Sequence, residues 1–294
     1  MEGALHIDVP IHITGFFQPY YTENPLTTGS VGAGLVLSPG VRVSVRAGDR
    51  EATRLNGRPV GITPVSLVLK HFPPLEVDIT SRLPPGVGFS VSASTTLGTA
   101  LLAGRLTNIP PTKAAQLAHV AEVRAMTGLG DIPAIYSGGS LVVRTKPGAP
   151  GVGEVKQIPT PEKITVIAAS LGRMDTEIML TQYADKINHY GYRALIKFSE
   201  NPSFENFLDT SEWFSNMVGF MTTDIKNILR PVRSKLLGAL VKKKALLAVT
   251  YADEAQDVFT YLSGVFESVY CFNVGDARWR MSLYQEPILG TSLS

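Results

Sequence analysis

The sequence has a single cysteine, Cys271, in 294 residues. One cysteine excludes both an intramolecular disulfide and a cluster of thiolate metal ligands. It also agrees with a reducing compartment. Tyr270 and Phe272 flank the cysteine, and this apolar setting predicts a thiol packed inside a core strand. The five histidines show no zinc spacing.

Long hydrophobic runs are missing as well. No apolar stretch approaches the roughly 20 residues needed to cross a bilayer. No charged segment followed by an apolar run opens the chain. We therefore expect no membrane partner and a cytoplasmic location. Hydrophobic residues make up 44% of the chain and charged residues 18%, which favours a folded protein over a disordered one.

Charge of one sign is equally scarce. The formal net charge is +2 and no long basic stripe is present, so we expect no nucleic-acid partner. The densest basic run, Lys242-Lys243-Lys244, directly precedes an apolar segment. This arrangement predicts the solvated start of a strand.

The glycine-rich segment 84–94, Pro-Pro-Gly-Val-Gly-Phe-Ser-Val-Ser-Ala-Ser, carries the strongest functional signal. Its glycines let a backbone approach a bulky anion, and the helix predicted over 93–103 would point its N-terminus at phosphate. The segment is neither a Walker A motif nor a dinucleotide fingerprint. An ordinary serine-capped turn is the alternative. The residues expected to cradle a nucleoside triphosphate are Pro85, Gly86, Gly88, Ser90, Ser92 and Ser94.

A second group of candidate residues follows in the helix predicted over 112–127. His119 and Glu122 lie three residues apart and therefore on one face of this helix. Mg²⁺ prefers carboxylate and phosphate oxygens, which makes Glu122 a candidate metal ligand together with the Ser92 hydroxyl. Asp131 follows in a glycine-rich turn, where it could accept the proton of an acceptor hydroxyl or orient that hydroxyl.

The order of the expected elements, antiparallel strands followed by helices, predicts an α+β fold. The dense Pro/Gly segment 146–161 predicts a boundary between two lobes, 1–153 and 154–294. Asn56-Gly57 predicts a hairpin turn, and Pro39-Gly40 a break within a strand. Strands are expected over 5–13, 34–45, 75–81, 140–144, 164–169, 245–251 and 268–273, and helices over 93–103, 112–127, 181–198, 204–217, 223–230 and 253–266.

These motifs resemble the GHMP kinase superfamily. Its central motif is a proline, three residues and Gly-Leu-Gly-Ser-Ser-Ala, to which Pro84 through Ala93 is similar, with Ser90 replacing a glycine and Val91 the first serine. The resemblance implies a two-lobed fold with a ferredoxin-like C-terminal lobe. It also implies ATP as phosphate donor, Mg²⁺ held by Ser92 and Glu122, and a catalytic role for Asp131.

Within the superfamily, the chain resembles the archaeal pantoate kinases. The segment Val9–Phe17 is similar to their P-x-H-I-T-x-F-F opening, and 29–35, 121–131 and 138–151 are similar too. The resemblance implies ATP-dependent phosphorylation of pantoate to 4-phosphopantoate in coenzyme A biosynthesis. We expect Ser30, His119 and Arg144 to bind pantoate, because arginine pairs in a bidentate manner with a carboxylate. His12 and Thr14 are interpreted as structural.

Other interpretations stay open at this point. The chain could be a GHMP-type kinase for another small hydroxy acid or alcohol, such as homoserine or mevalonate, or a non-catalytic homologue that binds nucleotide or ligand. A hydrolase using Ser90 or Ser92 is disfavoured, because the second glycine of a nucleophile elbow is missing. The sequence does not fix the nucleotide preference or the oligomeric state, so a homodimer is left open.

Overall fold

The computed structural model describes residues 5–275 and 278–283. The strands in this part of the chain are β1 (Leu5–Tyr20), β2 (Gly29–Ala47), β3 (Ala52–Leu55), β4 (Arg58–Pro59), β5 (Leu75–Thr80), β6 (Leu141–Lys146), β7 (Glu154–Ile158), β8 (Ile164–Ser170), β9 (Gly238–Lys242), β10 (Ala245–Tyr251), β11 (Val269–Val274) and β12 (Arg280–Leu283).

The α-helices of the same part are α1 (Thr63–Leu69), α2 (Val91–Leu106), α3 (Pro111–Arg124), α4 (Asp131–Ser137), α5 (Thr176–Gln182), α6 (Ala184–Glu200), α7 (Phe204–Val218), α8 (Thr223–Leu229) and α9 (Ala255–Ser263). A 3₁₀ helix at Arg230–Lys235 follows α8. The mixture of helices with a largely antiparallel sheet confirms the predicted α+β class.

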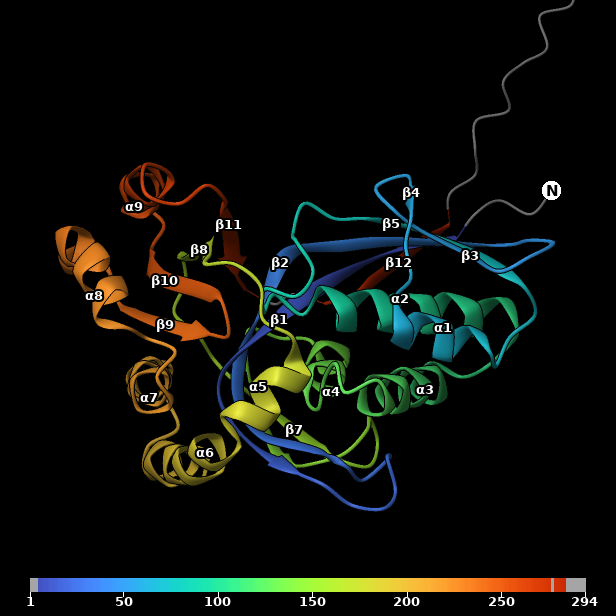
Figure 1. Cartoon of the computed structure of the whole chain (residues 1–294), viewed down its shortest axis with the longest axis horizontal. Helices are drawn as coiled ribbons and strands as arrows, with labels where there is room; N and C mark the ends of the chain where they lie inside the picture. Colours follow the sequence, from blue (N-terminus) through green and yellow to red (C-terminus); the bar gives the residue numbers. More distant parts are fainter. Residues whose placement is uncertain (1–4, 276–277, 284–294) are drawn as a thin grey trace, which may run out of the picture.

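The long strand β2 holds the sheet together (Figure 1). It pairs with β1 along almost its whole length and also with β5, β6 and β11. Beyond β11, the strands follow the order β11-β8-β10-β9, which is the strand order of a ferredoxin-like half. The sheet therefore runs without interruption through both halves of the chain.

Helices cover the sheet in two groups (Figure 1). α2 packs on β1 and β2 with α1 and α3 beside it, whereas α6 and α7 pack near β1 and β9. Close approach depends on glycine at two places. A Cβ added at Gly98 would lie 2.8 Å from Val43 Cγ2, and one at Gly191 would lie 2.1 Å from the Phe17 carbonyl oxygen. These contacts let α2 and α6 pack closely on β1 and β2, the strands that carry His12 and Ser30.

Several predicted elements need correction. The break predicted at Pro39-Gly40 takes the form of a β-bulge: the β1–β2 register shifts there, and β2 continues beyond it. The helix predicted over 181–198 is divided into α5 and α6 at Tyr183, whose backbone is not helical. The Pro/Gly segment contains β7, which pairs with β6, and Asp131 begins α4 rather than sitting in a turn.

Two further expectations concern a side chain and the lobes. Cys271 is exposed, not buried, because alternation along β11 directs Phe272 into the core and its neighbours outward. The division at residues 153 and 154 stays a prediction. β7 pairs with β6 and β11 pairs with β2, so strands pair across that boundary.

Candidate active site

The glycine-rich segment forms a loop that leads directly into α2. Gly86 and Gly88 have φ angles of +82° and +127°, which favour glycine, and Ser90 has φ 55° at the start of the helix. The first turn of α2 contains no acidic residue. Its unpaired backbone N–H groups and the positive end of its dipole therefore make this a suitable place for an anion.

Two cavities adjoin this loop. The larger, of about 470 Å³, is lined by Pro85, Gly86, Gly88, Ser90 and Ser92 together with residues of α1, α3 and α5. The smaller, of about 30 Å³, is lined by Thr14, Ser30 and the backbone at 127–131 among others. The residues that line both cavities are Thr127, Asp131, Thr176, Lys242 and Lys243. The cavities therefore meet at Asp131.

Glu122 presents a carboxylate to the larger cavity. Its Oε1 accepts hydrogen bonds from Ser92 Oγ at 2.7 Å and from Thr96 Oγ1 at 3.0 Å. Its Oε2 is buried without a hydrogen-bond partner among the described residues. Burial raises the pKa of Glu122, and the Ser92 hydrogen bond partly offsets this rise. An unpaired buried carboxylate oxygen beside a serine hydroxyl fits a hard cation.

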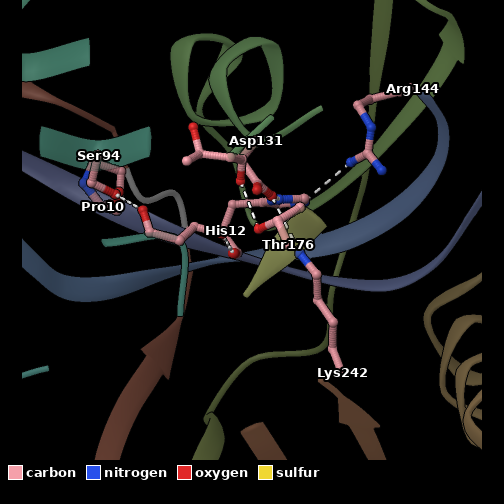
Figure 2. A network of polar contacts seen from close by, with 9 residues as sticks. Pro10, His12, Ser94, Asp131, Arg144, Thr176 and Lys242 are labelled. Atoms are coloured by element: carbon pink, nitrogen blue, oxygen red, sulfur yellow. Dashed lines mark hydrogen bonds and ion pairs between the residues drawn. The ribbon is translucent and has the colours of Figure 1, made fainter. Parts of the chain in front are cut away.

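Asp131 is the centre of a network of polar side chains from four elements (Figure 2). Its Oδ1 lies 2.7 Å from His12 Nδ1 and 3.6 Å from Lys242 Nζ. On the other side of the imidazole, His12 Nε2 lies 3.3 Å from Arg144 Nη1. Arginine only donates, so His12 Nε2 accepts, and the ring proton on Nδ1 is donated to Asp131. His12 is therefore neutral in this network.

The charges in the network shift one another. Burial alone would raise the pKa of Asp131, but Lys242, the His12 hydrogen bond and Arg144 hold it well below its usual range. Burial lowers the pKa of His12 to about 4, against the opposing effect of Asp131. Burial also lowers the pKa of Arg144 to about 10. The site thus holds a permanent carboxylate among cations at neutral pH.

The basic run is not the solvated strand start that the sequence predicts. Lys242 ends β9 and Lys243 lies in the turn to β10, and their exposed fractions are only 8% and 9%. The turn packs against the glycine-rich loop, since Lys244 N donates to the Val87 carbonyl at 3.1 Å. That long-range contact turns both lysines inward.

The remaining predicted residues are placed differently from one another. Ser30 lines the smaller cavity, and Arg144 packs behind Gly130, where an added Cβ would lie 2.5 Å from its Nε. His119 lines neither cavity, because it is buried and its Nε2 is bonded to the Thr28 carbonyl at 2.9 Å. Ser94 likewise is turned away and donates to the Pro10 carbonyl at 2.8 Å.

Sequence reasoning missed His12, Thr14, Lys242 and Lys243 as residues of the site. His12 and Thr14 lie on β1, in the segment that is similar to the pantoate kinases. That resemblance pointed to a functional role, whereas their position within a strand indicates only a structural one. For Lys242 and Lys243, the sequence contains no signal of a functional role beyond their charge. Among the described residues, no group of three or more His, Cys, Asp or Glu side chains could hold a metal ion. A hard cation here would complete its coordination with oxygens from phosphate or water.

Comparison with known proteins agrees with this geometry. Residues 62–139 match the family described as GHMP kinases N terminal domain. The pantoate kinase of Thermococcus kodakarensis is 33% identical over 87% of this chain and 90% of its own length. The pantoate kinase of Methanocaldococcus jannaschii is 32% identical over 76% of this chain and 84% of its own length. The chain belongs to the pantoate kinase family.

A solved structure supports the family's fold in this chain. A protein described as a phosphotransferase related to the CoA biosynthesis pathway superposes with a TM-score of 0.86 at 28% identity, covering 96% of this chain and 99% of the other. The predicted GHMP kinase fold is therefore confirmed. In this chain the glycine-rich loop and Glu122 lie beside one cavity. No helix in the described residues is long and apolar enough to span a membrane.

The buried neutral His12 makes the stability depend on pH. Its pKa is about 4 in the folded protein, below the ordinary value of 6.5, so the unfolded chain binds more protons between these values. Folding stability should therefore fall as the pH drops, by about 1.5 kcal/mol from His12 between pH 6.5 and 5.0. Urea unfolding at both values measures this loss. His12→Asn should show a smaller loss over the same interval, whereas the exposed His71→Asn should behave as wild type. Equal losses in all three proteins would contradict the assignment.

Proposed function

We propose that this protein is an ATP-dependent pantoate kinase that forms 4-phosphopantoate on the route to coenzyme A. The observation that carries the proposal is the position of Asp131 where two cavities meet, one beside the glycine-rich loop and one beside Ser30. A kinase needs a nucleotide site and an acceptor site that share one point of transfer. Membership in the pantoate kinase family supports pantoate as the acceptor over homoserine and mevalonate.

The nucleotide belongs in the larger cavity in this proposal. The triphosphate lies at the N-terminus of α2, where backbone N–H groups donate to it. Ser92 Oγ and the unpaired Oε2 of Glu122 would hold Mg²⁺ against the phosphates. The ion would neutralise negative charge on the transferred γ-phosphoryl group. Ser90 contributes backbone more than hydroxyl, because its Oγ is bonded to the His12 carbonyl.

Pantoate belongs in the smaller cavity. Ser30 and Thr14 offer hydroxyls there, and Arg144 lies behind Gly130 with an Nε that has no partner among the described residues. We infer that this guanidinium attracts the pantoate carboxylate. The α5 side chains Met179 and Leu180 also line this cavity and give it an apolar wall.

Asp131 would act on the acceptor hydroxyl. In the reaction the hydroxyl oxygen bonds to the γ-phosphorus, the bond to the β,γ-bridging oxygen breaks, ADP leaves, and the hydroxyl proton passes to water. A carboxylate with a strongly lowered pKa is a weak proton acceptor, which favours orientation of the hydroxyl over early removal of its proton. A loose transition state, in which the proton leaves late, is compatible with this role.

The direct test of the function is ADP release from ATP and Mg²⁺ with pantoate, followed by identification of the product by ³¹P NMR. We expect turnover with pantoate and much slower release with homoserine or mevalonate. Efficient phosphorylation of either competitor without any turnover of pantoate would refute the acceptor and keep the kinase. No nucleotide-dependent transfer to any of the three would refute the proposed function.

Removing the proposed metal ligands should impair transfer through Mg²⁺. Ser92→Ala and Glu122→Gln should each lower kcat by about 10²-fold or more, because charge on the γ-phosphate is less well neutralised. Both should also need more Mg²⁺ for half-maximal ATP binding, which calorimetric titration measures. Glu177→Gln is the matched control, since Glu177 lines the same cavity but is exposed. Wild-type behaviour of both site variants would move the metal elsewhere.

Asp131→Asn tests the acceptor side. The amide keeps the size of the side chain and removes its charge, so kcat with pantoate should fall by about 10²-fold or more. ATP affinity should change little, because the glycine-rich loop is intact. Steady-state kinetics and ATP titration measure the two effects separately. A folded variant that no longer binds ATP would show that Asp131 belongs to the nucleotide side of the site.

A further inference from the structure

The turn between β9 and β10 places two lysines where the cavities meet. Lys242 and Lys243 line both cavities, although each side chain is largely buried. Burying an ammonium group is unfavourable unless charge or hydrogen bonds compensate for the lost water. Two adjacent buried lysines therefore need an explanation.

Their contacts compensate only in part. Lys242 Nζ lies 3.6 Å from Asp131 Oδ1, an oxygen already bonded to His12. Lys243 Nζ donates to the neutral hydroxyl of Thr176, and it forms no ion pair within the described part of the chain. An ammonium group has three donors, so Lys243 keeps donors to spare. Burial, and then the neighbouring Lys242, lowers its pKa to about 8.

The local charge balance favours an anionic ligand. Among the largely buried groups, Lys242, Lys243 and Arg144 bring three positive charges, against the two carboxyl groups of Asp131 and Glu122. The other charged residues of the larger cavity, Arg173, Asp175 and Glu177, are exposed, so water screens them. The Glu122 pKa is raised by burial, which weakens its negative contribution further. Asp131, Glu122 and the exposed Asp175 all act electrostatically on Lys243, so Lys243 lies near both the carboxyl group proposed for the metal and the one proposed for the acceptor.

The backbone of this turn is fastened to the glycine-rich loop. A Cβ added at Gly88 would lie 2.8 Å from the Lys242 carbonyl oxygen and 3.6 Å from Lys243 Cβ. Lys244 N donates to the Val87 carbonyl on the neighbouring residue of the loop. The lysines are therefore held in place relative to the N-terminus of α2.

The conformation of Lys243 also points to a function. Its φ of 57° lies in the left-handed region, which favours glycine. A lysine there adds backbone strain of about 1 kcal/mol. Retaining both strain and a buried charge at one position is typical of functional sites.

We propose that Lys242 and Lys243 bind the γ-phosphoryl group of ATP while it passes from the nucleotide to the acceptor. Lys243 contacts the phosphoryl oxygens from the larger cavity, and Lys242 contacts them where the cavity of the acceptor begins. The inference rests on the proposed kinase function and adds to it a second source of positive charge besides Mg²⁺. Electrostatic stabilisation of this kind is the main means of catalysis in phosphoryl transfer.

Lys243→Gly tests the proposal without introducing strain, because glycine adopts the positive φ freely. ATP and ADP differ by the γ-phosphate, so titration of both with Mg²⁺ isolates the contact. We expect the Kd for ATP to rise at least about tenfold while the Kd for ADP stays within about twofold, and kcat to fall by about 10²-fold. Lys163→Gly is the matched control. Lys163 has φ 58°, is exposed and lines neither cavity, so its removal should leave both affinities unchanged.

Two further variants keep the test decisive. Lys243→Asn replaces the glycine variant if that variant does not fold, because asparagine tolerates the left-handed region. Lys242→Met should likewise lower kcat and weaken ATP more than ADP. Equal weakening of ATP and ADP, or no change in either, would overturn the proposal. Wild-type protein that binds both nucleotides but does not phosphorylate pantoate would overturn the proposed acceptor instead, and the ATP-to-ADP ratio would still decide the role of the lysines.

Discussion

One buried negative charge organises this site. The Asp131 carboxylate begins α4, and its stabilising partners come from β1, β6 and β9. Removing one partner of a buried ion pair is strongly unfavourable, because the remaining charge has lost its water as well. The carboxylate is therefore stable only when these distant segments have all reached their places. The charge pattern of the site therefore depends on the tertiary packing of all four elements.

The local parts of the site could be predicted from sequence. Glycines before a helix predict a phosphate-binding loop, because their backbone can adopt positive φ angles. Glu122 and His119 lie three residues apart and so share one helix face, whatever the helix packs against. The order of strands and helices also gave the correct fold class. The division of the predicted helix at Tyr183 and the existence of strand β7 depend on tertiary contacts, which no local pattern contains.

The contacts of His12, His119, Lys242 and Lys243 could not be predicted from the sequence. His119 was expected at the substrate and His12 in the core, yet His119 bonds a loop carbonyl and His12 links Asp131 to Arg144. Strand alternation shows on which face of the sheet His12 lies. It does not show that Asp131 and Arg144, more than 100 positions later in the chain, contact the imidazole. Likewise, a Lys-Lys-Lys run is usually solvated. Only the packing of its turn on the glycine-rich loop turns two of the three inward.

The charges of the site are complementary to a nucleotide rather than balanced without one. Glu122 is disfavoured as an anion by its burial, while Lys242 and Lys243 are disfavoured as cations by theirs. A phosphate group with a divalent cation would reverse both penalties at once, since the cation stabilises the carboxylate and the phosphate stabilises the ammonium groups. The Asp131 carboxylate needs no ligand to stay charged, because its own neighbours already keep it ionised. In the proposed site, the Asp131 carboxylate is thus ionised before any ligand arrives, whereas Glu122 and the two lysines reach their full charges only with the nucleotide bound.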